Sequence, residues 1–159
     1  MKFMQKAALA VALVASVATA QEQRGEAKAT VAGKAVAVEY GRPVLAGRDM
    51  LGQAKAGTPW RMGAGSPTSL KTEADLAFGA VAVPKGSYVL TAVKDDKGGW
   101  TVIVSAPDGK TKVAEVPLTS TVIKDPVEQF TIAVTGKGNA GELSMSWGTA
   151  KMAAAFTAK

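Results

Sequence analysis

The sequence predicts an all-β protein: an antiparallel β-sandwich of about eight or nine short strands, preceded by a cleavable signal peptide. Apolar and polar residues alternate through several short segments, which is the pattern of strands buried on one face. Turn sequences rich in glycine, proline and aspartate separate these segments at intervals of roughly 8–12 residues. No amphipathic helix of convincing length follows the N-terminal segment, so the strands are expected to pack on one another.

Residues 1–20 have the layout of a secretory signal peptide. Lys2 and Lys6 give a basic start, an apolar run follows at 7–17, and the segment ends in the small-residue pattern A-x-A at Ala20. The apolar run is shorter than the roughly 20 residues that a spanning helix needs, and an uncleaved anchor is the alternative. We expect cleavage after Ala20, export to the periplasm or the medium, and no membrane span in the mature chain.

Residues 21–159 are then expected to form one all-β domain, since this length suits a single core. The sequence contains neither histidine nor cysteine. Ser-His-Asp catalysis, thiol nucleophiles, disulfides and zinc sites built from these residues are therefore excluded. Paired carboxylates, Ser-Lys pairs and all-oxygen metal sites stay open in principle, but no motif indicates a cofactor or a metal.

The formal net charge is +6, and it becomes +4 once Lys2 and Lys6 leave with the signal peptide. The lysines are scattered over turns and strand faces, which favours a solvated surface over a binding face for anionic polymers. Nucleic-acid binding would need a basic stripe with interleaved aromatic residues, so we expect no such partner. No stretch indicates a particular oligomeric state.

The first strand is expected at 34–40, where Val36, Val38 and Tyr40 share one face. The residues before it, 21–28, are polar and are expected to be a frayed lead-in. Glycine, proline and aspartate mark the turns between the next segments. Further strands are expected at 68–72, 77–83, 87–93, 100–105 and 112–118.

The C-terminal part has the two clearest alternations, at 130–134 and 143–147, joined by a glycine-rich turn. A last strand is expected after Gly148. The segment 119–127 is expected to be a polar connection because it holds Pro126, which cannot donate to a ladder. Trp100 and Trp147 lie in phase with apolar strand positions, so both are expected in the core.

Gly41, Arg42 and Pro43 interrupt the first strand, and the segment 45–65 that follows has no strand period and is expected to be a long ordered loop. The stretch 38–66 around this loop holds three of the four arginines, Arg42, Arg48 and Arg61, together with Tyr40 and Trp60. A guanidinium group grips a carboxylate or phosphate with two hydrogen bonds, and an aromatic ring offers a stacking platform. These five residues form the candidate binding site for a small anionic or glycan ligand. The hypothesis requires the three guanidinium groups to converge on one accessible hollow.

The arginines also have a structural interpretation. They would pin the loop to the sheet by pairing with Glu39, with Asp49 or with loop carbonyl groups, and Trp60 would stack against one of them. An enzyme acting on envelope carbohydrate through Glu39 or Asp49 is a further alternative. Because a carboxylate beside arginine is held in its charged form, it makes a poor general acid at neutral pH. The sequence therefore favours a non-catalytic role.

The residues of this loop resemble the Y-x-R-P, G-R and W-R-x-G-A motifs of domain-of-unknown-function (DUF) family 2911, a family of exported bacterial proteins. The matching stretches are 40–43, 47–48 and 60–64. The hairpin sequence at 83–90 is similar to the V-P-x-G-x-Y-x-L segment of that family, and the strands at 100–103 and 143–147 match in order and type. The resemblance covers nearly all of the mature chain. It implies an all-β fold and an exported location, and it implies no particular reaction.

Two positions depart from the family pattern. Gly65 stands where the family tends to carry asparagine, and Ser66 stands at the position of an acidic residue. If those two side chains belong to a family site, that site is altered in this protein. The sequence as a whole indicates an exported binding or accessory module of the cell envelope, with a purely structural envelope protein as the other non-enzymatic alternative.

Overall fold

A computed structural model describes residues 23–159, so the expected signal peptide lies outside the described residues. Within this range the chain forms ten strands, and none of its segments is a helix long and apolar enough to cross a membrane. The strands are β1 (Arg24–Val31), β2 (Lys34–Gly41), β3 (Thr68–Thr72), β4 (Leu76–Phe78), β5 (Val81–Val83), β6 (Gly86–Lys94), β7 (Trp100–Ser105), β8 (Lys112–Pro117), β9 (Thr119–Lys137) and β10 (Ala140–Ala158).

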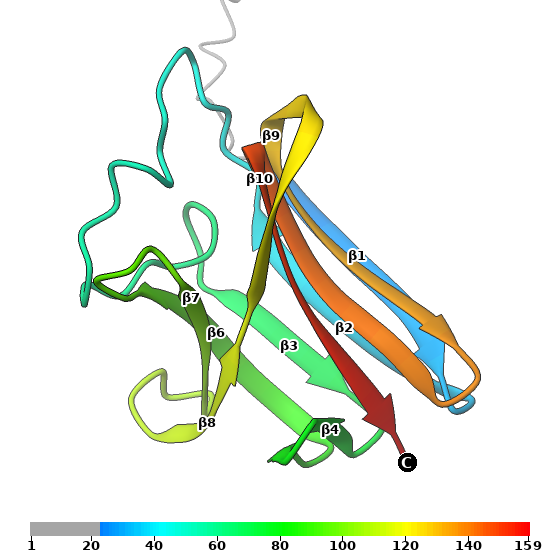
Figure 1. Ribbon diagram of the computed structural model, residues 1–159. Coiled ribbons are helices and arrows are strands. Elements are labelled where there is room, and N and C mark those ends of the chain that lie inside the picture. The colour runs from blue at the N-terminus through cyan, green and yellow to red at the C-terminus, as the bar shows by residue number, and fades with distance from the viewer. Residues whose placement is uncertain (1–22) are drawn as a thin grey trace, which may run out of the picture.

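The strands form two antiparallel sheets that pack face to face (Figure 1). One sheet has six strands in the order β1-β2-β3-β6-β7-β8, and the other has four in the order β5-β4-β10-β9. At one side of the sandwich β1 and β2 contact β9, and at the other side β5 contacts β8. The prediction of an all-β antiparallel sandwich is confirmed.

The core lies between the sheets and follows the alternation of the sequence. On β2 the side chains of Val36 and Val38 are buried, and the intervening Ala37 is only partly covered. Leu90 on β6 and Phe130 on β9 are equally inaccessible. Full burial of such a side chain stabilises the fold by about 1.5–3 kcal/mol, which explains why the alternation is sufficient to predict the strands.

Several expected boundaries were wrong. The polar stretch before residue 29 is not a lead-in, because β1 pairs with β2 from Arg24 to Val31. The expected strand at 77–83 is two short strands, β4 and β5, that pair with each other. The sequence missed both features because β1 has an exposed polar face and because a two-residue turn leaves little mark on the pattern.

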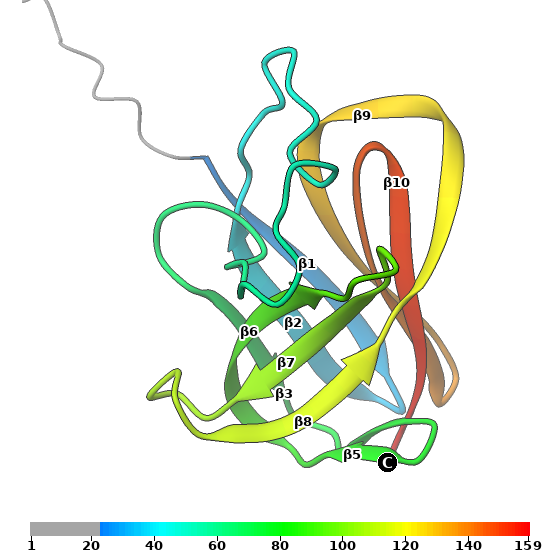
Figure 2. The same ribbon diagram turned by 60° about the vertical axis from the view of Figure 1, so that its left-hand side comes forward.

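The segment 119–127, expected to be a polar connection, is the first part of the long strand β9. Thr119–Val122 pairs with β10, and the register then shifts on both sides of Gly148. Residues 123–126 consequently lie opposite Thr149 alone, so this part of β9 bulges outward (Figure 2). Pro126 is tolerated because it lies within the bulge, where no ladder donor is needed.

The connection from β2 to β3, residues 42–67, is the long loop that the sequence predicted. It lies at one end of the sandwich, beside the β6–β7 turn and the bulge of β9 (Figures 1 and 2). The part of the loop that leads back to β3, which we call the return limb (residues 60–67), lies directly against the end of β2. A side chain at Gly41 would overlap the carbonyl oxygen of Ala64, and a Cβ at Gly63 would lie 2.7 Å from the carbonyl oxygen of Gly41.

We expect the substitution Gly41→Ala to lower the free energy of unfolding by about 3 kcal/mol, because the new methyl group meets backbone that cannot move aside. Gly109→Ala is a suitable control, since nothing lies within 4 Å of a Cβ there. Its positive φ of 72° should cost about 1 kcal/mol. Urea unfolding measures both values, and equal losses in the two variants would contradict this account of the contact.

Candidate functional site

Trp60 joins the long loop to the six-stranded sheet. Its backbone N–H donates to the carbonyl oxygen of Ala92, and the N–H of Ala92 donates back to Trp60, both at 2.8 Å. This exchange is an isolated antiparallel bridge outside the ladder of β6. The loop is therefore fixed to the sheet by backbone bonds at the residue that carries the indole ring.

The Trp60 ring enters a cluster of four large aromatic side chains. Its centroid lies 5.7 Å from that of Trp100, 5.1 Å from Phe130 and 6.0 Å from Trp147. The Trp60 and Trp147 rings are nearly parallel, 11° apart, and the other two pairs are edge-to-face. Each such pair contributes about 0.5–1.5 kcal/mol beyond area burial. The expectation that Trp100 and Trp147 belong to the core is confirmed, since they are 6% and 4% exposed.

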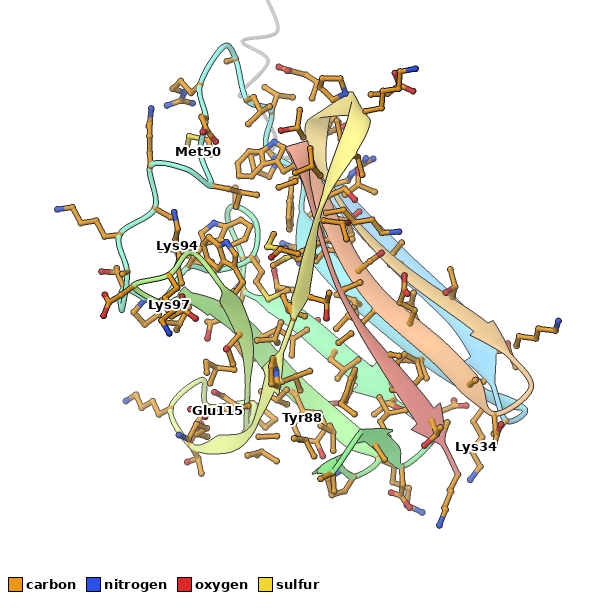
Figure 3. All side chains as sticks on the ribbon, viewed as in Figure 1. Lys34, Met50, Tyr88, Lys94, Lys97 and Glu115 are labelled. Atoms are coloured by element: carbon orange, nitrogen blue, oxygen red, sulfur yellow. The ribbon has the colours of Figure 1, made fainter. Side chains whose placement is uncertain are left out.

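Lysine and backbone groups fix the loop beside this cluster. Lys94, at the end of β6, donates from Nζ to the carbonyl oxygens of Leu51 and Gly52 at 3.1 and 3.5 Å. Figure 3 shows Lys94 beneath the part of the loop that carries Met50. The backbone N–H of Gly57 donates to the carbonyl oxygen of Lys94 at 2.8 Å. The part of the loop that precedes Trp60 is thus fixed to the end of β6.

A hollow of about 330 Å³ lies between the loop and the aromatic cluster. We call it the loop pocket. Its apolar lining includes the half-buried Trp60, the buried Trp147 and aliphatic loop residues, and its polar lining comes from the exposed residues Gln53, Lys55 and Thr58. The complete lining is Met50, Leu51, Gln53, Ala54, Lys55, Thr58, Pro59, Trp60 and Trp147. Small-molecule sites have this size and this mixture of an apolar lining with a few polar groups.

Tyr40 at the end of β2 and Arg42 at the start of the loop both contact β9. Tyr40 is 3% exposed, packs edge-on against Phe130, and donates its hydroxyl to the carbonyl oxygen of Ile132 at 3.3 Å. Arg42 is half-buried and donates from Nε to the carbonyl oxygen of Phe130 at 3.1 Å and from Nη2 to Thr131 Oγ1 at 3.0 Å. Both side chains therefore connect β2 to the four-stranded sheet.

Arg48 and Arg61 are exposed on the loop. Arg48 Nε donates to the carbonyl oxygen of Leu45 at 3.4 Å, and Arg61 Nη1 donates to that of Gly65 at 3.1 Å. The three candidate arginines thus have three different carbonyl partners, and Trp60 is the one candidate residue in the lining of the loop pocket. These bonds fit the structural interpretation of the arginines, while the binding role of the five residues stays a prediction.

The carboxylates near the loop are not paired with these arginines. The ion pairs found within residues 23–159 are Lys112–Glu115 and Lys151–Glu142. Asp49 accepts a bond from the backbone N–H of Gly52 at 2.9 Å and so closes a turn of the loop. The Asp49 side chain therefore stabilises a turn of the loop and does not pair with an arginine.

Glu39 lies on the outer face of the six-stranded sheet, directly opposite Glu26 in the register of β1 and β2. The two side chains are exposed and line a hollow of about 380 Å³ together with Lys28 and Lys71. This arrangement was not predicted from the sequence, because Glu26 was expected to lie in a frayed lead-in. The arrangement gives the carboxylate hypothesis a second carboxyl group close to Glu39.

Titratable groups with a displaced pKa lie elsewhere. Burial raises the pKa of Tyr88, and the charge of Asp75 raises it further. The backbone N–H groups of Thr111 and Lys110 lower the pKa of Asp108. Neither group lines the loop pocket. Residues 23–159 also contain no group of three or more acidic side chains arranged to hold a metal ion.

Most of the loop pocket was not predicted from the sequence. The predicted site residues are charged or aromatic, whereas Met50, Leu51, Ala54 and Pro59 supply much of the lining. The sequence does hold a signal for these residues, because Met50 and Leu51 are apolar side chains in a glycine-rich loop. Such side chains are expected to pack against another part of the protein. Lys94 gave no signal, because its role depends on which loop lies over the end of β6.

The fold and the site define a β-sandwich whose long β2–β3 loop is anchored by tryptophan over an open apolar pocket. Residues 22–156 match the family described as Protein of unknown function (DUF2911), so the chain belongs to this family. Neither a curated protein nor a solved structure matches the sequence. The resemblance inferred from the loop motifs and the hairpin at 83–90 is thereby confirmed.

We expect Arg42→Ala to lower the free energy of unfolding by about 1–3 kcal/mol, because it removes two charge-assisted bonds to β9 from a half-buried position. Arg48→Ala is the matched control. It removes one long bond from an exposed side chain and should change stability by less than about 0.5 kcal/mol. Urea unfolding of both variants measures the difference, and a greater loss in Arg48→Ala would reverse the assignment.

Proposed function

We propose that this protein is an exported, non-catalytic binding module of the cell envelope, and that its ligand is a small anionic molecule or a glycan held at the β2–β3 loop. The observation that supports the proposal is the loop pocket, in which two indole rings lie beside an amide, a hydroxyl and an ammonium group. An apolar surface with few polar groups binds the ring of a ligand and fixes its orientation.

The charge of the loop supports an anionic or acidic ligand. Residues 42–67 carry four basic side chains and a single acidic one, which is Asp49. Lys55 lines the pocket itself, and the exposed guanidinium groups of Arg48 and Arg61 add to the local positive potential. Such a field raises the local concentration of anions and speeds their association.

The order of the loop also supports a binding role. Its backbone is bonded to Ala92, Lys94 and Glu128, and its Arg42 side chain is bonded to strand β9. A pocket whose walls are already in place does not require an additional loss of conformational entropy when the ligand enters. In this proposal the structural and the binding interpretations of the arginines are compatible, because pinning the loop is what shapes the pocket.

A carboxylate-dependent enzyme is the second candidate, and the observation that favours it is the Glu26–Glu39 pair over an outer-face hollow. A glycosidase needs one carboxyl group in an environment that keeps it protonated near neutral pH. Both glutamates are exposed and are flanked by lysines, so we rank this candidate below the binding module. The exposed apolar side chains Val44, Val113 and Val122 lie on different elements, and a purely structural envelope protein ranks third.

A thermal-shift screen tests the binding proposal with phosphate, citrate, galacturonic acid and N-acetylglucosamine as probes. We expect at least one probe to raise the unfolding midpoint, since a ligand at 100 times its Kd stabilises the folded state by about 2.7 kcal/mol. The variant Ala54→Phe fills the pocket from its half-buried wall and should abolish the shift.

Ala155→Phe, at an exposed position of β10, is the matched control and should keep the shift. A shift that survives Ala54→Phe would place the ligand outside the loop pocket. If a glycan probe is instead cleaved, and Glu39→Gln stops the cleavage, the enzyme candidate replaces the binding module.

A further inference from the structure

The loop pocket has a neighbour on the other side of Leu51. This second hollow measures about 390 Å³ and lies between the loop, the β6–β7 turn and the paired strands β9 and β10. We call it the hydroxyl pocket. Its lining is Asp49, Leu51, Gly52, Lys94, Gly98, Trp100, Ser120, Thr121, Val122, Thr149, Ala150 and Met152.

Two elements, the long loop and β10, line both pockets, so the pockets are parts of one groove. Leu51 lines both directly. Trp60 lines the loop pocket and Trp100 the hydroxyl pocket, and the centroids of their rings are 5.7 Å apart. On β10, Trp147 lines the first pocket and Thr149 the second, two residues further along the strand.

The two parts of the groove differ in chemistry. The loop pocket is lined by indole, proline and aliphatic groups, whereas the hydroxyl pocket presents Ser120, Thr121 and Thr149. These three hydroxyl-bearing residues are exposed on paired strands of the four-stranded sheet. A ligand that spans the groove therefore needs an apolar face at one end and several hydrogen-bonding groups at the other.

Leu51 and Gly52 form the ridge between the two pockets, and neighbouring side chains hold the backbone of this ridge in place. Lys94 Nζ donates to the carbonyl oxygens of Leu51 and Gly52, and Asp49 accepts from the backbone N–H of Gly52. Because both ionic side chains bond to the backbone of the ridge, the two pockets keep a fixed spacing. A fixed spacing suits a ligand made of repeated units.

We propose that this groove binds an acidic oligosaccharide of at least two linked sugar rings. One pyranose ring lies in the loop pocket with its C–H face against the indole rings of Trp60 and Trp147. The next ring crosses Leu51 and bonds through its hydroxyl groups to Thr121 and Thr149. Lys55 and the excess of basic residues on the loop select sugars that carry carboxylate groups. This inference rests on the proposed binding function and names its ligand class.

Calorimetric titration with galacturonic acid and its linear oligomers of two to four residues tests the proposal. We expect Kd to fall at least tenfold from the monomer to the trimer, because the second ring reaches the hydroxyl pocket. Chitooligosaccharides of the same lengths serve as the neutral series and should bind at least tenfold more weakly.

Two variants separate the halves of the groove. Thr149→Phe fills the hydroxyl pocket from an exposed position and should remove the gain in affinity with oligomer length. Thr121→Trp fills the same pocket from β9 and should do the same. Thr157→Phe, exposed at the far end of β10, is the matched control and should bind like the unmodified protein. Thermal melts confirm that each variant is folded.

The outcomes distinguish this inference from the proposed function. Equal affinity for monomer and oligomers, or a gain with length that survives both Thr149→Phe and Thr121→Trp, would overturn the groove and leave a single-ring binding module standing. Equal affinity for the acidic and neutral series would overturn the selection for carboxylate groups. Failure of every sugar in both series would overturn the inference, and an anion such as citrate that still binds the loop pocket would leave the proposed function standing without it.

Discussion

The packing of Trp60 against Trp100, Phe130 and Trp147 is the interaction on which the rest of the site depends. It brings together a loop residue, a strand of the six-stranded sheet and two strands of the four-stranded sheet. Its effect is to convert a long connection without regular structure into a wall of defined shape. Without these contacts, ordering the loop would cost on the order of 1–2 kcal/mol per residue in conformational entropy, and few other contacts would offset that cost.

Two of the motifs on which the resemblance to the family rests meet at the base of the loop. The Tyr40–Pro43 motif ends β2 and the Trp60–Ala64 motif begins the return limb, and they touch where Gly41 and Gly63 leave no room for a side chain. Thr68 at the start of β3 closes the limb by donating from Oγ1 to the carbonyl oxygen of Met62 at 2.8 Å. The motif residues are thus accounted for first by the attachment of the loop, and the pocket is a consequence of that attachment.

The sequence predicted the sandwich, the long loop and the core positions of Trp100 and Trp147, because alternation and turn chemistry are local signals. It did not predict β1 or the first half of β9, since both expose polar side chains and owe their structure to pairing with β2 and β10. The candidate residues were chosen for their chemistry, yet the wall of the pocket is largely aliphatic. Lys94 and Thr149 reach the groove through tertiary structure alone, which no pattern in one sequence records.

The central claim is that Trp60 holds the loop as firmly as the sheet holds its own strands. Native-state hydrogen exchange of the backbone amides of Trp60 and Ala92 tests it directly, because each donates to the other residue at 2.8 Å. The account predicts that both amides exchange as slowly as that of Val102 in β7, which is paired on both sides, and far more slowly than the exposed Gly47 amide in the same loop. Exchange of the Trp60 amide at the rate of Gly47 would contradict the claim and remove the basis for a preformed pocket.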